Sequence, residues 1–417
     1  MNTTRDALVT RRIRKARIAT FIGFAAIGAL MYIWSTGVSA LRDQIGLSGA
    51  TGDVRFGLLA LAIGLGAAIG SFGVGYFLDA IGPRRVITVG AIAYPIVIVM
   101  LGYAGSYTTA LVLGVVLGLL RGGLDTALNT HGVQVERFYG RSIMSAFHAF
   151  YSIGGFAFGL IASWLATMST TSPAIPFTVL GGLLAVVGIA TSPWLLSKGE
   201  VPDSTPETAN ADAAVAPSGS SDFAVVLLMI GFGLLLLGSM IGENAIADWG
   251  QEFVRRATGS PLSTAGLAVS VFIGAEAVGR LAGDRAAEVF GREKVVFGSG
   301  LVSVIGLAIV IAGGTVAAAI VGFGLFGLGL SSIAPLMLSS AGRKDPAHAG
   351  RNIGIVNSIG YLGMLVGPAL ITVIVGQFGL SKLLYLPIGL LILLTVFGPL
   401  LMRDRRLSEH DANQGRT

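Results

Sequence analysis

The sequence predicts an all-α membrane protein with twelve transmembrane helices, arranged as two pseudo-symmetric six-helix bundles. Three observations predict this class. The 417 residues are 53% hydrophobic and only 12% charged, whereas an ordinary soluble domain has roughly 25% charged residues. Apolar runs that reach the roughly 20 residues needed to cross a bilayer recur along the whole chain. One long polar segment lies near the middle of the chain, and short motifs on its two sides repeat one another.

Twelve apolar runs are long enough to span a membrane, and each is interrupted by few charged residues. The predicted spans are 17–42, 53–79, 84–105, 107–134, 142–168, 175–196, 223–249, 262–284, 292–313, 315–340, 352–377 and 380–402. Because their number is even, the two termini lie on the same side of the membrane.

The distribution of positive charge indicates which side that is. Of the 28 Lys and Arg residues, 21 lie before the first span, after the last span or in the loops on the side of the termini. Five lie in the opposite loops, and two, Arg121 and Arg280, lie inside spans. Because basic residues accumulate in cytoplasmic loops, we expect both termini in the cytoplasm. The basic cluster at 11–17 is interpreted as an anchor of this topology.

The polar segment 197–221, rich in Pro, Ser and Ala, is typical of a flexible linker. It divides the chain into predicted bundles at 1–196 and 222–417. The two parts also repeat each other, since GRSIMSAFHAFY from Gly140 aligns with GRNIGIVNSIGY from Gly350. Related halves of this kind can rock against each other around a central site.

Several functional classes are excluded by composition. Cysteine is absent, so the chain has no disulfides, thiolate metal sites or cysteine nucleophiles. The four histidines are scattered and form no HExxH pair. The net charge of +6 is explained by basic loops between the spans, so we expect no nucleic-acid partner. We expect neither an enzyme nor a protein with a cofactor or metal, because the chain offers no catalytic constellation.

Two loops carry a related charged pattern, which we interpret as a conformational gate. GYFLDAIGPRR follows the second span, and GRLAGDRAAEVFGREK follows the eighth. The gate candidates in these loops are Asp79, Arg84, Arg85, Asp284 and Arg285. The first loop resembles the GxxxDxxGR[RK] signature of the major facilitator superfamily, except that Pro83 displaces the basic pair by one position.

Three further stretches resemble the YbjJ-like branch of this superfamily, which lies near the fucose-permease type of sugar/proton symporter. They are DTALNTHGVQVER from Asp125, MSAFHAFYSIGG from Met144, and ENAIADWGQEFVR from Glu243 followed by VGRLAGDR. The resemblance implies a carrier of the bacterial inner membrane, with a fold in which spans 1, 4, 7 and 10 surround a cavity. It also implies a secondary active transporter of a small organic solute, for which a proton is the expected coupling ion.

The strongest candidate site is the stripe of Arg121, Asp125 and Asn129 in the fourth span. Spacings of four place these side chains on one helical face, and a charge at the middle of a membrane helix costs roughly 2.5–3.5 kcal/mol unless it is paired or hydrated. The resemblance implies a proton-coupling role for Asp125, since symporters of this type use an acid in this span. Arg121 and Asn129 are candidates for substrate binding. The alternative is a structural ion pair between Asp125 and Arg121.

The other candidates lie in spans 1, 5, 7, 8 and 11, and for each a purely structural role is the alternative. For proton coupling they are Glu276, Glu243 and His148. For substrate binding they are Tyr32, Trp34, Asn244, Asp248, Arg280, Asn357 and Tyr361. Glu276 and Arg280 repeat the four-residue spacing of the fourth span and could equally form a structural pair.

The sequence therefore favours a proton-coupled secondary transporter, sugar-like solutes being one class of substrate. Its partners are expected to be a small molecule and the lipid bilayer, and the chain is expected to be a monomer. Two alternatives stay open at this point: a drug/proton antiporter that exports amphipathic compounds, and a non-transporting receptor or scaffold on a carrier fold.

Overall fold

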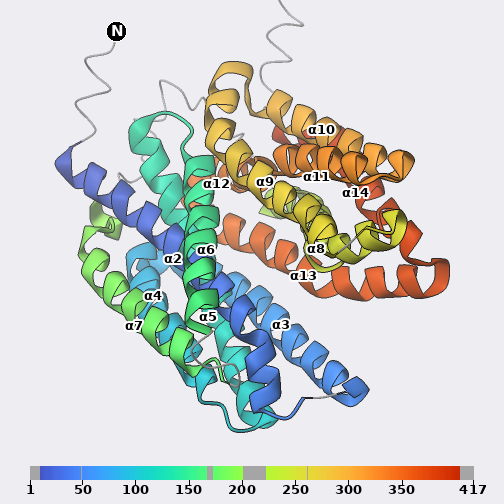
Figure 1. Cartoon of the computed structure of the whole chain (residues 1–417). Helices are drawn as coiled ribbons and strands as arrows, with labels where there is room; N and C mark the ends of the chain where they lie inside the picture. Colours follow the sequence, from blue (N-terminus) through green and yellow to red (C-terminus); the bar gives the residue numbers. More distant parts are fainter. Residues whose placement is uncertain (1–9, 48, 167–171, 201–221, 261, 404–417) are drawn as a thin grey trace, which may run out of the picture.

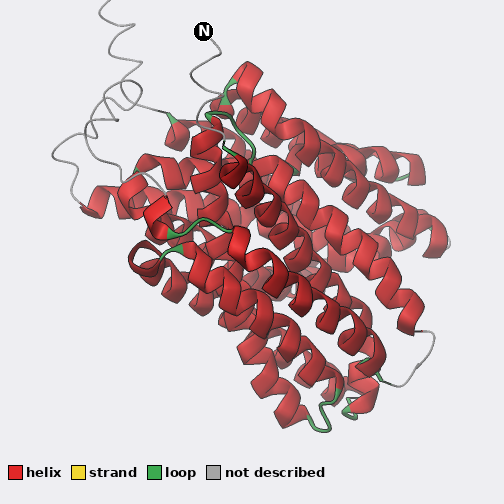
Figure 2. Cartoon of the chain, turned by 90° about the vertical axis from the view of Figure 1, so that its left-hand side faces the viewer, coloured by secondary structure: helices red, strands yellow, loops and turns green. Residues whose placement is uncertain are grey.

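The computed structural model describes residues 10–47, 49–166, 172–200, 222–260 and 262–403. Within these ranges every regular element is helical (Figure 2). Large apolar side chains also lie on the outer surface, as Phe77, Phe156 and Val186 show with 64%, 64% and 62% of their surface exposed. Such a surface suits contact with lipid tails, so the prediction of an all-α membrane protein is confirmed.

The first half of the chain contains six long helices. They are α2 (Arg11–Gln44), α3 (Gly49–Ile81), α4 (Pro83–Gly102), α5 (Tyr107–Tyr139), α6 (Met144–Ala166) and α7 (Ala174–Thr191). Local sequence sets their ends: the Ser106 hydroxyl accepts from the Thr109 N–H at 3.2 Å as the N-cap of α5, and Pro83 begins α4. Gly140, with φ at 58°, ends α5 in the left-handed conformation that glycine adopts most easily. Two short turns follow, η1 (Ser192–Trp194) and η2 (Lys198–Glu200).

The second half contains seven helices over six predicted spans. They are α8 (Asp222–Thr258), α9 (Leu262–Phe290), α10 (Arg292–Gly313), α11 (Val316–Leu330), α12 (Ile333–Lys344), α13 (Ala349–Phe378) and α14 (Tyr385–Met402), with the short turns η3 (Pro346–His348) and η4 (Leu380–Lys382). The predicted span 315–340 is thus two helices, α11 and α12. Pro335 explains the break, because its ring displaces the carbonyl of Ser331 four residues earlier and it has no N–H to donate.

The predicted number of spans agrees with the helices. Eleven segments of the described chain are long and apolar enough to cross a membrane, and α11 with α12 counts as one of them. The 29-residue α9 packs against α8 and α11 and supplies the twelfth.

The halves repeat the same helix pairings. In the first half α2 packs on α6, α3 on α5, and α4 on α7. The equivalent pairs in the second half are α8 with α13, α9 with α11, and α10 with α14. The halves contact each other through α3 with α13 and through α6 with α9 (Figure 1). This arrangement is the predicted pair of pseudo-symmetric bundles. The exact domain limits stay a prediction, because 201–221 lie outside the described residues.

Both described ends of the chain lie at the same face of the helical bundle, which we call the terminal face. Near the start of α2, Arg17 lies over the ring of Tyr139 at the end of α5. Glu136, also at this end of α5, binds Arg343, and the neighbouring Lys344 donates to the carbonyl of Arg403. The predicted basic anchor at 11–17 has specific partners there. The Arg12 guanidinium donates to both carboxylate oxygens of Glu200, at 2.6 and 2.8 Å, and to the carbonyl of Leu195 at 2.6 Å. The end of the first half is therefore fixed to its own first helix.

Close backbone approach explains some of the abundant glycine. A Cβ added at Gly122 of α5 would lie 1.9 Å from the carbonyl oxygen of Ala67 on α3. At the contact between halves, a Cβ at Gly75 of α3 would lie 3.0 Å from the Cα of Gly354 on α13. Membrane helices pack closely where both surfaces carry small residues.

Candidate functional site

Asp125 of α5 and Asn357 of α13, both predicted site residues, meet between the two halves. The Asn357 amide donates to the Asp125 carboxylate at 2.6 Å and to the Thr126 hydroxyl at 3.3 Å. The Tyr361 hydroxyl is a further hydrogen-bonding neighbour of this carboxylate. The Thr126 hydroxyl in turn lies 2.6 Å from that of Ser71 on α3. An ionisable group inside the spans is therefore bonded directly across the interface between halves.

The stripe on α5 continues on both sides of Asp125, as predicted. The Arg121 guanidinium lies over the ring of Tyr361, 5.6 Å from its centroid. The Asn129 amide donates to the backbone carbonyl of Asp125 at 2.9 Å, and its oxygen lies 3.0 Å from Nε2 of His148 on α6. The predicted residues of spans 4, 5 and 11 thus form one polar centre.

A second polar group lies between α6 and α9. Arg280 pairs with Glu276 one turn earlier on α9, as the spacing predicted, and donates to the Ser152 hydroxyl of α6 in the other half. Glu243 of α8 and Tyr32 of α2 lie within electrostatic range of Arg280. Arg280 therefore connects the predicted residues of spans 1, 7 and 8 into one neighbourhood.

The charges of the two groups do not balance among the described side chains. Arg121 and Arg280 provide two cations, whereas Asp125, Glu243 and Glu276 provide three carboxylates. Both cations act on Glu243 electrostatically, so the groups form one connected system. Such a system has room for one additional positive charge, which a proton or a cationic solute can supply.

Three predicted binding residues stand apart from these contacts. The centroid of the Trp34 ring lies 6.5 Å from that of Phe177 on α7. Trp34 therefore takes part in the packing of α2 against α7 and is not brought to the polar centre. The amide nitrogen of Asn244 is buried and has no hydrogen-bond partner in the described part of the chain. Asp248 belongs to α8, but its side chain lies outside the described residues.

The predicted gate acids cap helices of the opposite half. Asp79, near the end of α3, accepts from the N–H groups of Gly350 at 3.0 Å and Arg351 at 3.2 Å, in the first turn of α13. A carboxylate at this position satisfies otherwise unpaired N–H groups and complements the helix dipole.

Asp284, near the end of α9, makes the pseudo-symmetric contact with α6. It accepts from the N–H groups of Ser145 at 2.9 Å and Ala146 at 2.7 Å, and from the Ser142 hydroxyl at 3.1 Å. These contacts are between halves and lie toward the terminal face.

The predicted gate cations are not part of the caps. Arg285 pairs with Glu288 on its own helix at 3.2 Å, and 79% of its side chain is exposed. Arg85 is exposed at the start of α4, and the carbonyl of Arg84 accepts from the Thr88 hydroxyl within the same helix. At the two caps, carboxylates are therefore bonded to backbone N–H groups of the opposite half.

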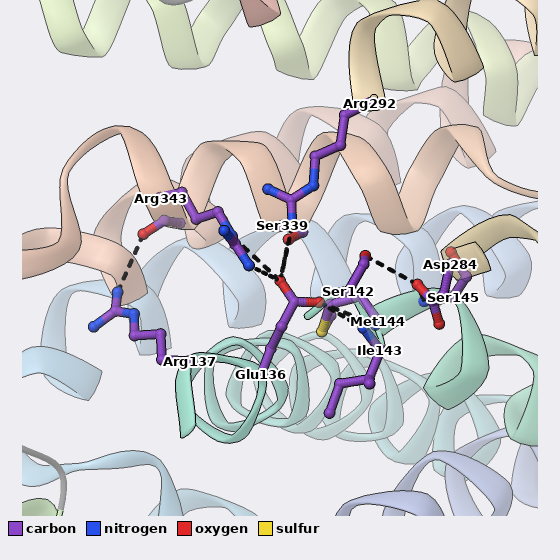
Figure 3. A network of polar contacts seen from close by, with 11 residues as sticks. Glu136, Arg137, Ser142, Ile143, Met144, Ser145, Asp284, Arg292, Ser339 and Arg343 are labelled. Atoms are coloured by element: carbon purple, nitrogen blue, oxygen red, sulfur yellow. Dashed lines mark hydrogen bonds and ion pairs between the residues drawn. The ribbon is translucent and has the colours of Figure 1, made fainter. Parts of the chain in front are cut away.

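Glu136, at the end of α5 nearest the terminal face, was not among the predicted site residues. Its side chain is fully buried and accepts from Arg343 and Ser339 of α12 at 2.8 Å, and from Arg292 of α10 at 3.2 Å (Figure 3). It also accepts from the N–H of Ile143 at 2.9 Å in its own half. The signal that could have indicated it is a carboxylate at the end of the span that contains Asp125.

The contacts between halves are concentrated at the polar centre and toward the terminal face. In Figure 1 the halves meet near the end that carries the N-terminus and diverge toward the opposite end. The structure is therefore closed at the terminal face.

Comparisons with known proteins agree with this architecture. A family model described as Major Facilitator Superfamily matches residues 223–417. An uncharacterised MFS-type transporter of Yersinia pestis is 32% identical over 368 residues, which cover 88% of this chain and 90% of that protein. The chain belongs to the major facilitator superfamily.

Solved structures of superfamily transporters share the fold. The proton:xylose symporter XylE matches with a TM-score of 0.73 and 13% identity, over 92% of this chain and 94% of that chain. FucP in its outward conformation matches with a TM-score of 0.66 and 14% identity, over 93% of this chain and 100% of that chain. The predicted resemblance to a superfamily transporter near the sugar symporters is confirmed. The chain is therefore a multi-pass membrane transporter of the superfamily.

Proposed function

We propose that this transporter is a proton-coupled carrier of the symport type, which moves a small polar organic solute by alternating access. The observation that supports it best is the bond between Asp125 of α5 and Asn357 of α13. A deprotonated carboxylate only accepts hydrogen bonds, whereas a protonated one also donates. Protonation of Asp125 therefore changes a contact between the two halves and shifts the balance between conformations.

The charge count supports the same mechanism. The polar centre and the second polar group together have one more carboxylate than cations among their described side chains, so neutrality requires one added positive charge. If a proton supplies it, the transported solute is neutral, as sugar-like compounds are. Glu276 and Glu243 share this charge system through Arg280 and are secondary candidates for the proton site, as is His148 through Asn129.

Solute recognition is assigned to polar side chains around the same centre. The buried Asn244 amide lacks a protein partner in the described chain, and a buried donor of this kind is costly unless a ligand or water accepts from it. Tyr32, Tyr361 and Arg280 provide hydroxyl and guanidinium donors in the two polar groups described for the site. Such donors fit the oxygen atoms of a hydroxylated solute.

The setting of this function follows from the charge distribution. The excess of Lys and Arg at the terminal face supports a cytoplasmic location for both termini in a bacterial inner membrane. With the termini in the cytoplasm, a structure that is closed at the terminal face is open toward the outside. We further propose that the chain works as a monomer with no cofactor.

The test needs a substrate first and then a coupling measurement. A thermal-shift screen of the purified protein against sugars, amino acids, organic acids and lipophilic cations identifies compounds that bind the folded state, because binding raises the Tm. Uptake of the best compound is then measured in proteoliposomes with an imposed pH gradient, for the unchanged chain, Asp125→Asn and the control Asp43→Asn. Asp43 is an exposed acid at the far end of α2.

We expect uptake on acidification of the outside, its loss in Asp125→Asn, and its retention in Asp43→Asn. Exchange of labelled for unlabelled solute without a gradient should survive in Asp125→Asn, because exchange needs no net proton movement. Gradient-driven uptake that survives in Asp125→Asn would exclude this assignment. Release of protons when a lipophilic cation is added would instead indicate a drug/proton antiporter.

A further inference from the structure

One cavity of the described chain lies at the terminal face, and none of the residues of the polar centre lines it. Its volume is about 810 Å³. It is lined by the loop 140–142 from the first half, and by the end of α9, the start of α10, the end of α12 and Met402 from the second half. The cavity therefore exists where the two halves come together on this face.

The lining of the cavity is strongly cationic. Its basic residues are Arg141, Arg292, Lys294, Arg343 and Lys344, and its acidic residues are Glu288 and Glu293. Each of these acids already has a cation beside it: Glu288 lies 3.2 Å from Arg285, and Glu293 lies 3.9 Å from Arg403. The cavity thus retains an excess of positive charge at a partly enclosed site.

Part of this charge is already used in the protein. Arg292 and Arg343 both bind Glu136 (Figure 3). The Lys344 amine donates to the carbonyls of Met402 and Arg403 at 3.2 and 3.1 Å. Arg141 and Lys294 are exposed on opposite halves of the lining. These two side chains can therefore turn toward a ligand without breaking a contact described above.

Backbone donors favour the same kind of ligand. The 22-residue α10 begins at Arg292, directly on the cavity, and its N-cap is Gly291, which has no side chain to accept from the first turn. The N–H groups of a helix start bind anions, and the helix dipole favours negative charge there. The helix start adds to the cationic cavity and does not define it alone.

We propose that this cavity binds a phosphate-bearing anion that bridges the two halves. Guanidinium groups match phosphate oxygens in a bidentate geometry, and lysine adds a point charge. Arg141 belongs to the first half, whereas Lys294 and the start of α10 belong to the second. A ligand that contacts both halves binds best when the terminal face is closed, so it shifts the population toward this conformation. The phosphate belongs either to a soluble anion or to a lipid headgroup.

The binding test uses the purified full chain and two phosphate probes. Inorganic pyrophosphate represents a soluble anion, and nanodiscs of phosphatidylcholine with or without phosphatidic acid represent a lipid headgroup. The variant Arg141→Gln/Lys294→Gln is compared with Arg11→Gln/Arg14→Gln, which removes the same charge from exposed positions of α2 on the same face. Sodium chloride at matched ionic strength controls for general salt effects.

We expect at least one probe to raise the Tm of the unchanged chain and of the α2 control, and to leave the Tm of Arg141→Gln/Lys294→Gln unchanged. Pyrophosphate as the active probe identifies a soluble ligand, and phosphatidic acid alone identifies a lipid. If the double variant has a lower Tm without probe, the single variant Lys294→Gln replaces it. An equal response of the cavity variant and the α2 control to both probes overturns the proposal.

The conformational part is tested separately with spin labels. The chain has no cysteine, so Lys15→Cys in α2 and Val289→Cys in α9, both exposed, provide one labelled pair across the halves. The active probe should increase the fraction of molecules in which the distance between the two labels is short. Binding without any change in the distance distribution overturns the bridging role.

Discussion

The substitution Glu136→Gln should open the terminal face. Glu136 makes its bonds to Arg343, Arg292 and Ser339 only while the halves are together, whereas its bond to the N–H of Ile143 stays within the first half. Only the first group therefore influences the balance between closed and open states. Glutamine keeps the shape of the side chain and removes the charge that the two guanidinium groups share.

The magnitude follows from the burial of the partners. A hydrogen bond to a charged group contributes roughly 1.5–3 kcal/mol when it is shielded from water. Glu136 is fully buried, but 41% of the Arg343 side chain and 22% of that of Arg292 are exposed, so solvent weakens both pairs. We take about 2 kcal/mol for the group, and since about 1.4 kcal/mol is a factor of ten, the closed state should lose population about thirtyfold relative to the open state.

The assay is electron–electron double resonance on the Lys15→Cys/Val289→Cys pair, with and without Glu136→Gln. The matched control is Glu200→Gln, since Glu200 also pairs with an arginine at this face, and within the described residues that arginine is Arg12 of the same half. We expect a longer distance between the two spin labels to dominate in Glu136→Gln, and we expect the distance distribution of Glu200→Gln to equal that of the unchanged chain. A distance distribution in Glu136→Gln identical to that of the unchanged chain would refute the reasoning.

Two further predictions concern the same face. An ideal Cβ at Gly283 lies 3.2 Å from the Cβ of Ser145 in the other half, close to the roughly 3.8 Å between the two Cβ atoms of a disulfide. Oxidation of the variant Ser145→Cys/Gly283→Cys should therefore stop transport, and reduction should restore it. Full transport by the oxidised variant would contradict closure of the terminal face. The Arg12 guanidinium, which donates to Glu200, lowers the pKa of this carboxyl from 4.5 to about 2. Its ionised form therefore stabilises the fold above about pH 4.5, and this stabilisation is lost as the pH falls through about 2. The difference in Tm between the unchanged chain and Glu200→Gln should shrink over this range, and a difference that is constant down to pH 2 would disprove it.

The sequence predicted the architecture well because membrane spans leave a direct hydrophobic signal. The main local difference is the break between α11 and α12, where Pro335 interrupts a run that is apolar on both sides. The stripe of Arg121, Asp125 and Asn129 was predictable because helical spacing alone places these residues on one face. Pattern reasoning works wherever the interaction lies within one helix.

Contacts between distant helices were only partly predictable. Asp79 was recognised as a gate candidate by its loop, but its partners are backbone N–H groups of α13, which no side-chain pattern reveals. Glu136 was missed because its cationic partners are more than 150 residues away along the chain. The position of Trp34 against Phe177 likewise depends on the rotation of α2 about its axis, which the largely apolar sequence around Trp34 does not determine.

The two reciprocal helix caps have a mechanical consequence. Asp79 of α3 caps α13 at one side of the interface between the halves, and Asp284 of α9 caps α6 at the other side. When one cap is removed, the other still holds the halves at its own edge, so we expect the halves to rotate apart about the remaining cap as a hinge. Both caps must release, together with the ion pairs of Glu136 to Arg292 and Arg343, before the halves can separate evenly, so we expect the opening of the terminal face to be cooperative.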